Sequence, residues 1–88
     1  MDTINLKDSF AKKLGMRTTA IKLFKYLEDK NEVVLDFQDV EFMSRSFAQE
    51  YVYQKHNSNV NIIESNMSDF IKGLLNVVQE DYNETFQL

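Results

Sequence analysis

The segment that decides the fold spans residues 33–50 and reads VVLDFQDVEFMSRSFAQE. In its first five residues, Val33, Leu35 and Phe37 should point to one face of an extended chain, and Val34 and Asp36 to the other. This period of two is typical of a β-strand with one buried face. The polar pair Gln38-Asp39 follows directly, so the segment predicts a strand that ends in a turn.

The second half of the segment predicts a helix that begins at Ser44 or Ser46. Ser46 and Gln49 have the spacing of a capping box, in which each side chain bonds the backbone N–H of the other residue. Residues 55–59 provide a positive last turn followed by loop-forming residues, so the helix should end there. Its expected inner face consists of Phe47, Ala48, Tyr51 and Val52.

Outside this segment, strands and helices continue to alternate. The expected elements are a short edge strand and turn within residues 4–14 and a helix over 18–29 capped by Thr18 or Thr19. A strand over 60–64 and a helix that starts after Asn66 and runs to about Tyr82 follow, with the tail 83–88 fraying. Strands that alternate with helices of this length predict βαβ units and a mainly parallel sheet. Right-handed crossovers that step in one direction put every helix on one face, so the opposite sheet face should be thinly covered. We therefore expect an α/β fold over residues 1–88: one small domain with a mainly parallel sheet of three to four strands and three helices.

The composition limits the chemistry that this domain can perform. Its 88 residues include no cysteine and a single histidine, which excludes disulfides, thiolate metal sites and any site that needs two imidazoles. Ten basic against fourteen acidic residues give a net charge of −4, a sign that disfavours nucleic-acid binding. The N-terminal residues lack the basic and apolar regions of a secretory signal, and no apolar run approaches the ~20 residues of a membrane span. We expect a cytoplasmic protein with no catalytic residues, no cofactor and no metal site.

The segment 33–50 also resembles the signature of STAS domains, the sulfate-transporter and anti-sigma-factor-antagonist fold. Both have a strand that ends in an aspartate and an apolar residue, then a short loop, an apolar pair and a serine-bearing turn that opens a helix. The sequence is most similar to a small STAS-like family of unknown function, whose members share an LDF…V…SFADE run and an arginine-opened first helix, as in Arg17-Thr18-Thr19-Ala20. The resemblance extends over about residues 4–78. It implies a STAS-like regulatory domain that binds a protein partner, such as a histidine-kinase-like ATPase or another regulator.

In the antagonist members of the wider family, a partner kinase phosphorylates the serine of this turn, and the phosphate abolishes binding. The family run of two apolar residues, Asp, Ser and Ser aligns with residues 42–46, so Arg45 stands at the phosphoacceptor position and Ser44 at the aspartate. Arginine cannot accept a phosphate, which leaves Ser46 as the candidate modification site. Gln49 replaces the aspartate of SFADE, whereas Glu50 matches its glutamate. The predicted partner-binding residues are Arg17, Ser44, Arg45, Ser46, Phe47 and Glu50.

Simpler roles compete with this interpretation. Ser44 and Ser46 both suit a helix cap, a contribution of typically ~1 kcal/mol that needs no partner. Arg45 is expected at a helix N-terminus, where the helix dipole disfavours a cation. A carboxylate of the partner or a phosphate ligand would compensate this charge, and a solvated arginine is the simpler alternative. His56 suits the C-terminus of the same helix, where a cation interacts with the last carbonyls. Local helix chemistry therefore accounts for the two serines and for His56 without any partner.

Other classes of function stay open beside the regulatory one. A nucleic-acid-associated or defence-system accessory protein would use the local basic cluster of Lys7, Lys12, Lys13 and Arg17. A phosphotransfer receiver would bind Mg²⁺ through the acidic group of Asp36, Asp39 and Glu41, which surface solvation also explains. Tyr26 and Tyr53 fit the inner faces of their helices poorly and are candidates for an exposed interaction patch. Homodimerisation through the uncovered sheet face or the last helix is a further alternative.

Overall fold

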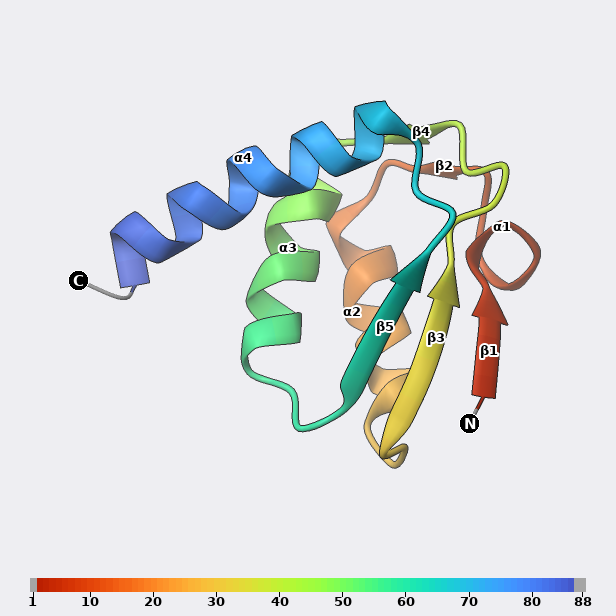
Figure 1. Cartoon of the computed structure of the whole chain (residues 1–88). Coiled ribbons are helices and arrows are strands. Elements are labelled where there is room, and N and C mark those ends of the chain that lie inside the picture. Colours follow the sequence, from red (N-terminus) through yellow and green to blue (C-terminus); the bar gives the residue numbers. More distant parts are fainter. Residues whose placement is uncertain (1, 87–88) are drawn as a thin grey trace.

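The computed structural model of this chain describes residues 2–86, which form two parallel sheets and four helices. The elements in chain order are β1 (Asp2–Asn5), α1 (Leu6–Ser9), β2 (Lys13–Leu14), α2 (Arg17–Leu27), β3 (Glu32–Asp36), β4 (Phe42–Met43), α3 (Arg45–His56), β5 (Asn61–Ser65) and α4 (Asp69–Phe86) (Figure 1). The main sheet has the order β1-β3-β5, and β2 pairs with β4 in a smaller parallel sheet. The predicted α/β fold with a mainly parallel sheet is confirmed.

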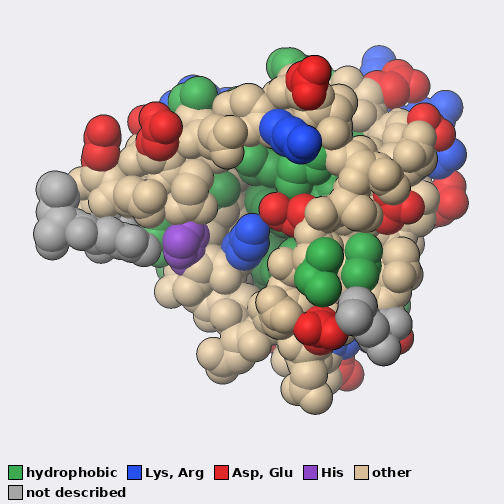
Figure 2. All heavy atoms as spheres, in the orientation of Figure 1, with side chains coloured by type: hydrophobic (Ala, Val, Ile, Leu, Met, Phe, Trp, Pro, Cys, Tyr) green, Lys and Arg blue, Asp and Glu red, His purple; other side chains and the backbone are tan. Residues whose placement is uncertain are grey.

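The two faces of the main sheet differ in what covers them. In Figure 1, α2 lies behind β5 and α3 lies beside it, and among the described residues no helix crosses the face turned toward the viewer. The face under the helices carries the buried residues Ile4, Val33 and Leu35. On the other face, the register places Val34 between Thr3 and Ile63, and Ile63 is 41% exposed. Hydrophobic side chains are visible there over β3 and β5 in Figure 2. The expectation that the helices gather on one face is thus met by α2 and α3.

Tyr51 of α3 lies at the centre of the core. The edges of two neighbouring rings meet it, with centroid distances of 5.6 Å to Phe24 and 6.2 Å to Phe37. The ring of Phe47 stacks on it at 6.2 Å. Such aromatic pairs each contribute ~1 kcal/mol beyond the area that they bury. The cluster fixes the rotation of α3 against the sheet, and it thereby sets which residues of this helix face outward.

The last helix, α4, packs mainly against α3 and extends beyond the sheet (Figure 1). Its inner face carries Ile71, Leu75 and Val78. The helix continues to Phe86, so the expected end near Tyr82 is wrong, and residues 87–88 of the predicted tail lie outside the described part of the chain. Gln79 Nε2 donates to Asn83 Oδ1 at 2.9 Å, an i to i+4 contact that stabilises this last part of the helix.

Two helix starts differ from the prediction. α2 begins at Arg17, with Met16 at the cap position, so the expected cap at Thr18 or Thr19 is wrong. The Thr19 N–H already donates to the Met16 carbonyl at 3.0 Å, which places both threonines in the first turn. Within residues 4–14, the expected turn is the single helical turn α1, capped by the Asn5 side chain, which accepts from the Asp8 N–H at 2.9 Å.

Candidate interaction groove

Three of the predicted contact residues line one groove between α3, α4 and the start of α2. The groove has a volume of about 370 Å³. Its lining includes Arg17, Ser46, Glu50, Tyr53, Val78 and Asp81. We call it the interaction groove. It joins residues that lie far apart in the chain, because α4 returns across α3 after β5 has been completed.

Two ion pairs border the interaction groove. Arg17 Nη1 lies 3.0 Å from Glu50 Oε1, and Gln54 Nε2 donates to the second Glu50 oxygen at 2.8 Å. Arg45 donates to the carboxylate of Asp81 on α4. Asp81 is thus the nearby acid that compensates a cation at the positive end of α3. Because both arginine side chains are more than half exposed, water screens these pairs and each stabilises the fold only slightly.

Three predicted contact residues at the start of α3, Ser44, Ser46 and Phe47, differ in exposure. The Ser44 hydroxyl accepts from the Phe47 N–H at 3.0 Å and donates to the Gly15 carbonyl at 2.9 Å, so Ser44 is the cap of α3. Ser46 lies inside the helix and is exposed, and the capping box that we expected between Ser46 and Gln49 is wrong. Phe47 is 1% exposed, because its ring faces the core. The prediction that Phe47 contacts a partner is therefore wrong, whereas its place on the inner face of the helix is confirmed.

The two tyrosines singled out from the sequence are both exposed, as predicted. Tyr53 is 48% exposed and lines the interaction groove. Tyr26 is 56% exposed on α2, and Lys30 Nζ lies 5.0 Å from its ring centroid. Only Tyr53 therefore shares a surface with the predicted contact residues.

His56 takes part in contacts between α3 and α4. It lies in the last turn of α3, as predicted. Its Nε2 is 2.9 Å from Gln79 Oε1, and its ring stacks on Tyr82 with a centroid distance of 4.4 Å. These contacts hold the end of α3 against α4.

The acidic residues after β3 are occupied by local contacts. The Asn66 amide and the Gln38 N–H both donate to Asp36, and these hydrogen bonds hold the pKa of its carboxyl below the ordinary value of 3.8. Asp39 lies 3.8 Å from the amino group of Lys7. In the described range 2–86, no three histidine, aspartate or glutamate side chains lie close enough together to hold a metal ion. The three acids of the receiver hypothesis thus form no common site there.

The basic cluster is largely neutralised by acids. Lys7 pairs with Asp8 and Asp39, Lys12 lies 4.0 Å from Glu41, and Arg17 pairs with Glu50. Among the residues that the structure describes, Lys13 is the member of the cluster without an ion pair. The field that phosphates would meet there is therefore weaker than the sequence indicated.

Sequence reasoning missed the α4 side of the interaction groove. Val78, Asp81 and Thr85 line it, but nothing in the sequence around them singles them out. The signal available was the pairing of charges: Arg45 needed an acid at the N-terminus of α3, and Asp81 supplies it. Which acid in the chain would do so depends on how α4 crosses α3.

No protein-family model matches this sequence, and no significant match was found among curated proteins or among solved structures. The resemblance to STAS domains therefore depends on the motif in residues 33–50 and on Arg17-Thr18-Thr19-Ala20. Across residues 2–86, no helix combines the length and the apolar character needed to cross a bilayer.

Proposed function

We propose that this domain is a non-enzymatic regulatory module that binds a protein partner in the interaction groove. The observation that carries the proposal is the convergence of Arg17, Ser46 and Glu50 with the half-exposed Tyr53 on one groove. Tyrosine and arginine are enriched in the centres of protein interfaces, where rigid rings and planar guanidinium groups bind at low entropic cost. The groove thus combines the predicted contact residues with the side chains that interfaces favour.

The partner should present an apolar side chain flanked by charge. The half-exposed ring of Tyr53 offers apolar surface in the groove, and the carboxylates of Glu50 and Asp81 border it. Because the ion pairs of these acids are screened, a charged residue of the partner exchanges with them at little cost. From the STAS resemblance, the partner proposed is a histidine-kinase-like ATPase or another regulator, met in the cytoplasm.

Ser46 is the position at which a modification would regulate this docking. Its side chain is exposed in the first turn of α3 and lines the groove. A phosphate there would be stabilised by the helix dipole and by arginine pairing, and it would fill the groove with negative charge. We propose that phosphorylated Ser46 weakens partner binding.

Photo-crosslinking from the groove tests the proposal. A benzoylphenylalanine placed at Tyr53 should yield a crosslinked partner in cells, while the same group at Tyr26 serves as a matched control on another surface. Adducts of the same proteins from both positions, or none from Tyr53, would refute the interaction groove as the contact surface. An adduct of twice the chain mass would identify a second copy, and the regulatory partner would give way to homodimerisation through α3 and α4.

A charge reversal provides the second arm of the test. Arg45→Glu places an acid beside Asp81 and should abolish the Tyr53 crosslink, whereas Lys22→Glu makes the same charge change at an exposed site on α2 and should preserve it. An unchanged Tyr53 crosslink in the Arg45→Glu protein would show that the partner does not bind at the interaction groove.

The nucleic-acid alternative is favoured by no observation of comparable strength. Its basic cluster is paired with acids, and the net charge is −4. A salt titration of RNA and DNA binding separates it from the regulatory function, since phosphate contacts weaken steeply as salt rises.

A further inference from the structure

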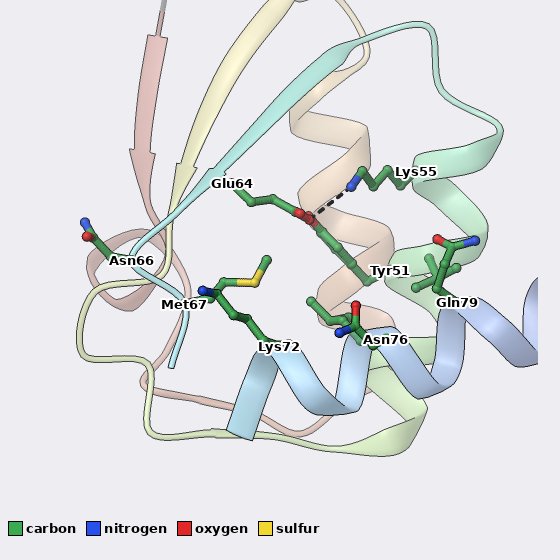
Figure 3. A pocket seen from close by; sticks show the side chains of 10 residues that line it. Tyr51, Lys55, Glu64, Asn66, Met67, Lys72, Asn76 and Gln79 are labelled. Carbon is green, nitrogen blue, oxygen red and sulfur yellow. Dashed lines mark hydrogen bonds and ion pairs between the residues drawn. The ribbon is translucent and has the colours of Figure 1, made fainter. Parts of the chain in front are cut away.

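A second pocket lies between the end of β5, α3 and the N-terminal half of α4. Its volume is about 560 Å³, and it shares no lining residue with the interaction groove. Figure 2 shows it as a hollow with a hydrophobic floor, bordered by basic and acidic side chains, and Figure 3 shows the side chains that converge on it. We call it the lysine pocket, after Lys55 and Lys72. None of its lining residues is among the predicted partner-binding residues.

The inner wall of the lysine pocket carries the carboxylate of Glu64. In the sheet register Glu64 lies beside the fully buried Leu35, at a position where a strand under helices normally has an apolar residue. A carboxylate there requires partners. The Tyr51 hydroxyl donates to it, and Lys55 Nζ lies 3.2 Å from Glu64 Oε2 (Figure 3). Burial raises the pKa of Tyr51 well above its ordinary value, so the phenol stays a neutral donor. The charge of Glu64 is therefore balanced within the protein.

Lys72 and Asn76 are polar groups of this pocket that the protein itself leaves unused. Within residues 2–86, neither side chain has an ion pair or a hydrogen bond. They stand one turn apart on α4, and both point into the pocket in Figure 3. Lys55 contributes further donors, because an ammonium group has three N–H bonds and the Glu64 contact does not use them all. One free cation, a free amide and a partly used ammonium thus face the same space.

The charge of the lysine pocket selects its ligand. Two lysines face one glutamate, so the lining is positive in a protein whose net charge is −4. A local excess of this kind attracts anions against the overall field. Apolar side chains complete the lining, with Met67 and Leu75 beside the polar groups. A volume of this size also falls within the roughly 300–1,000 Å³ typical of small-molecule sites.

We propose that the lysine pocket binds a small organic anion. Its carboxylate or phosphate group contacts Lys72, Asn76 and Lys55, and its apolar part lies against Met67 and Leu75. Glu64 does not bind the ligand directly; it holds Lys55 in place at the inner wall. Bound ligand would join α4 to β5 and α3, and α4 also forms one side of the interaction groove.

Three matched probes test this site by titration into isotope-labelled protein, followed by backbone amide NMR shifts. Phenyl phosphate and benzoate carry the two anionic groups on the same aromatic ring, and benzylamine carries a cation on it. At millimolar concentrations, at least one of the two anions should shift the amides of residues 64–67 and 72–79, and benzylamine should leave them unchanged. Binding of phenyl phosphate alone identifies a phosphate ligand, and binding of benzoate alone a carboxylate.

Single substitutions show which side chains of the lysine pocket contribute to the affinity for the anionic probe. Lys72→Gln should weaken the anionic probe about tenfold, the typical loss for one charge-assisted hydrogen bond. Asn76→Ala keeps the charge and should weaken it less. Lys22→Gln removes the same charge from an exposed position on α2 and should have no effect.

Three results would overturn the proposal. They are the absence of pocket shifts with both anions, binding of benzylamine as tight as that of the anions, and equal weakening by Lys72→Gln and Lys22→Gln. None of these depends on whether a protein partner occupies the interaction groove, because the two sites share no residue.

Discussion

Leu35 and Val34 are neighbours on β3, yet they belong to two different surfaces. Leu35 is fully buried under α2 and α3, whereas Val34 lies on the sheet face that no described helix covers. Parallel sheets usually have helices on both faces. Here both crossovers step in the same direction along β1-β3-β5, and α2 and α3 therefore lie on one side. The covered face packs in the core and stabilises the fold, whereas side chains on the open face need not be apolar.

The open face is polar around a small apolar centre. Val34 and Ile63 lie side by side in the register, and the polar row of Asn5, Asp36 and Ser65 follows on one side of them. On the other side, Asn61 Nδ2 donates to Glu32 at 2.7 Å. Water solvates such a surface without the need for a third layer, which explains how a chain of 88 residues tolerates an uncovered sheet.

The largest expected effect comes from breaking the covered face. Leu35→Ala should lower the free energy of unfolding by about 2–5 kcal/mol, because it leaves a cavity under the helices. Val34→Ala, on the open face of the same strand, should cost less than about 1 kcal/mol. Urea denaturation of both variants measures the difference. Equal losses would mean that a further element covers the open face.

A smaller effect concerns the polar residue on the covered face. Glu64→Leu should destabilise the protein by about 1–3 kcal/mol, because the buried Tyr51 hydroxyl loses its acceptor. Adding Tyr51→Phe removes that hydroxyl and should recover most of the loss, which a double-mutant cycle detects. Additive losses in the double variant would show that the hydroxyl and the carboxylate do not depend on each other.

Two serines at the start of α3 show a similar contrast, because the Ser44 hydroxyl is hydrogen-bonded within the protein and Ser46 is exposed. Ser44→Ala should cost about 1 kcal/mol, because the Phe47 N–H loses its cap. Ser46→Ala should leave the melting temperature almost unchanged, since its side chain faces the interaction groove. Thermal denaturation of both variants distinguishes the two serines. A larger loss of melting temperature for Ser46→Ala than for Ser44→Ala would show that Ser44 is not the cap of α3.

The smallest expected effect is a pH dependence on the open face. The hydrogen bonds from Asn66 and Gln38 lower the pKa of Asp36 in the folded protein relative to the unfolded chain. A carboxyl of this kind stabilises the fold above its unfolded pKa, and the contribution disappears as the pH falls through the folded pKa. The stability of wild type should therefore decline more than that of Asp36→Asn between about pH 5 and pH 2. Parallel acid titrations of both proteins measure this difference, and an equal decline of the two would show that folding does not lower the pKa of Asp36.

Several features of the fold could be predicted because they depend on local periods. The alternation in residues 33–37 predicted β3, and the spacing of apolar residues predicted α2, α3 and α4 and the exposure of Tyr26 and Tyr53. The same spacing placed Phe47 on the inner face of α3, and the motif-based expectation that it meets a partner failed for that reason. Periodicity reports which side of an element is apolar, and that side is buried wherever the element packs.

The sequence by itself determined the α/β alternation, the buried faces and the residue types at the start of α3. Only the tertiary structure decided between Ser44 and Ser46, because the Gly15 carbonyl, brought near by the pairing of β2 with β4, accepts the Ser44 hydroxyl. It also decided both candidate sites, which form where α4 crosses α3 and joins residues far apart in the chain. A local pattern cannot encode such contacts, since the crossing of two helices depends on the shapes of both packed faces at once.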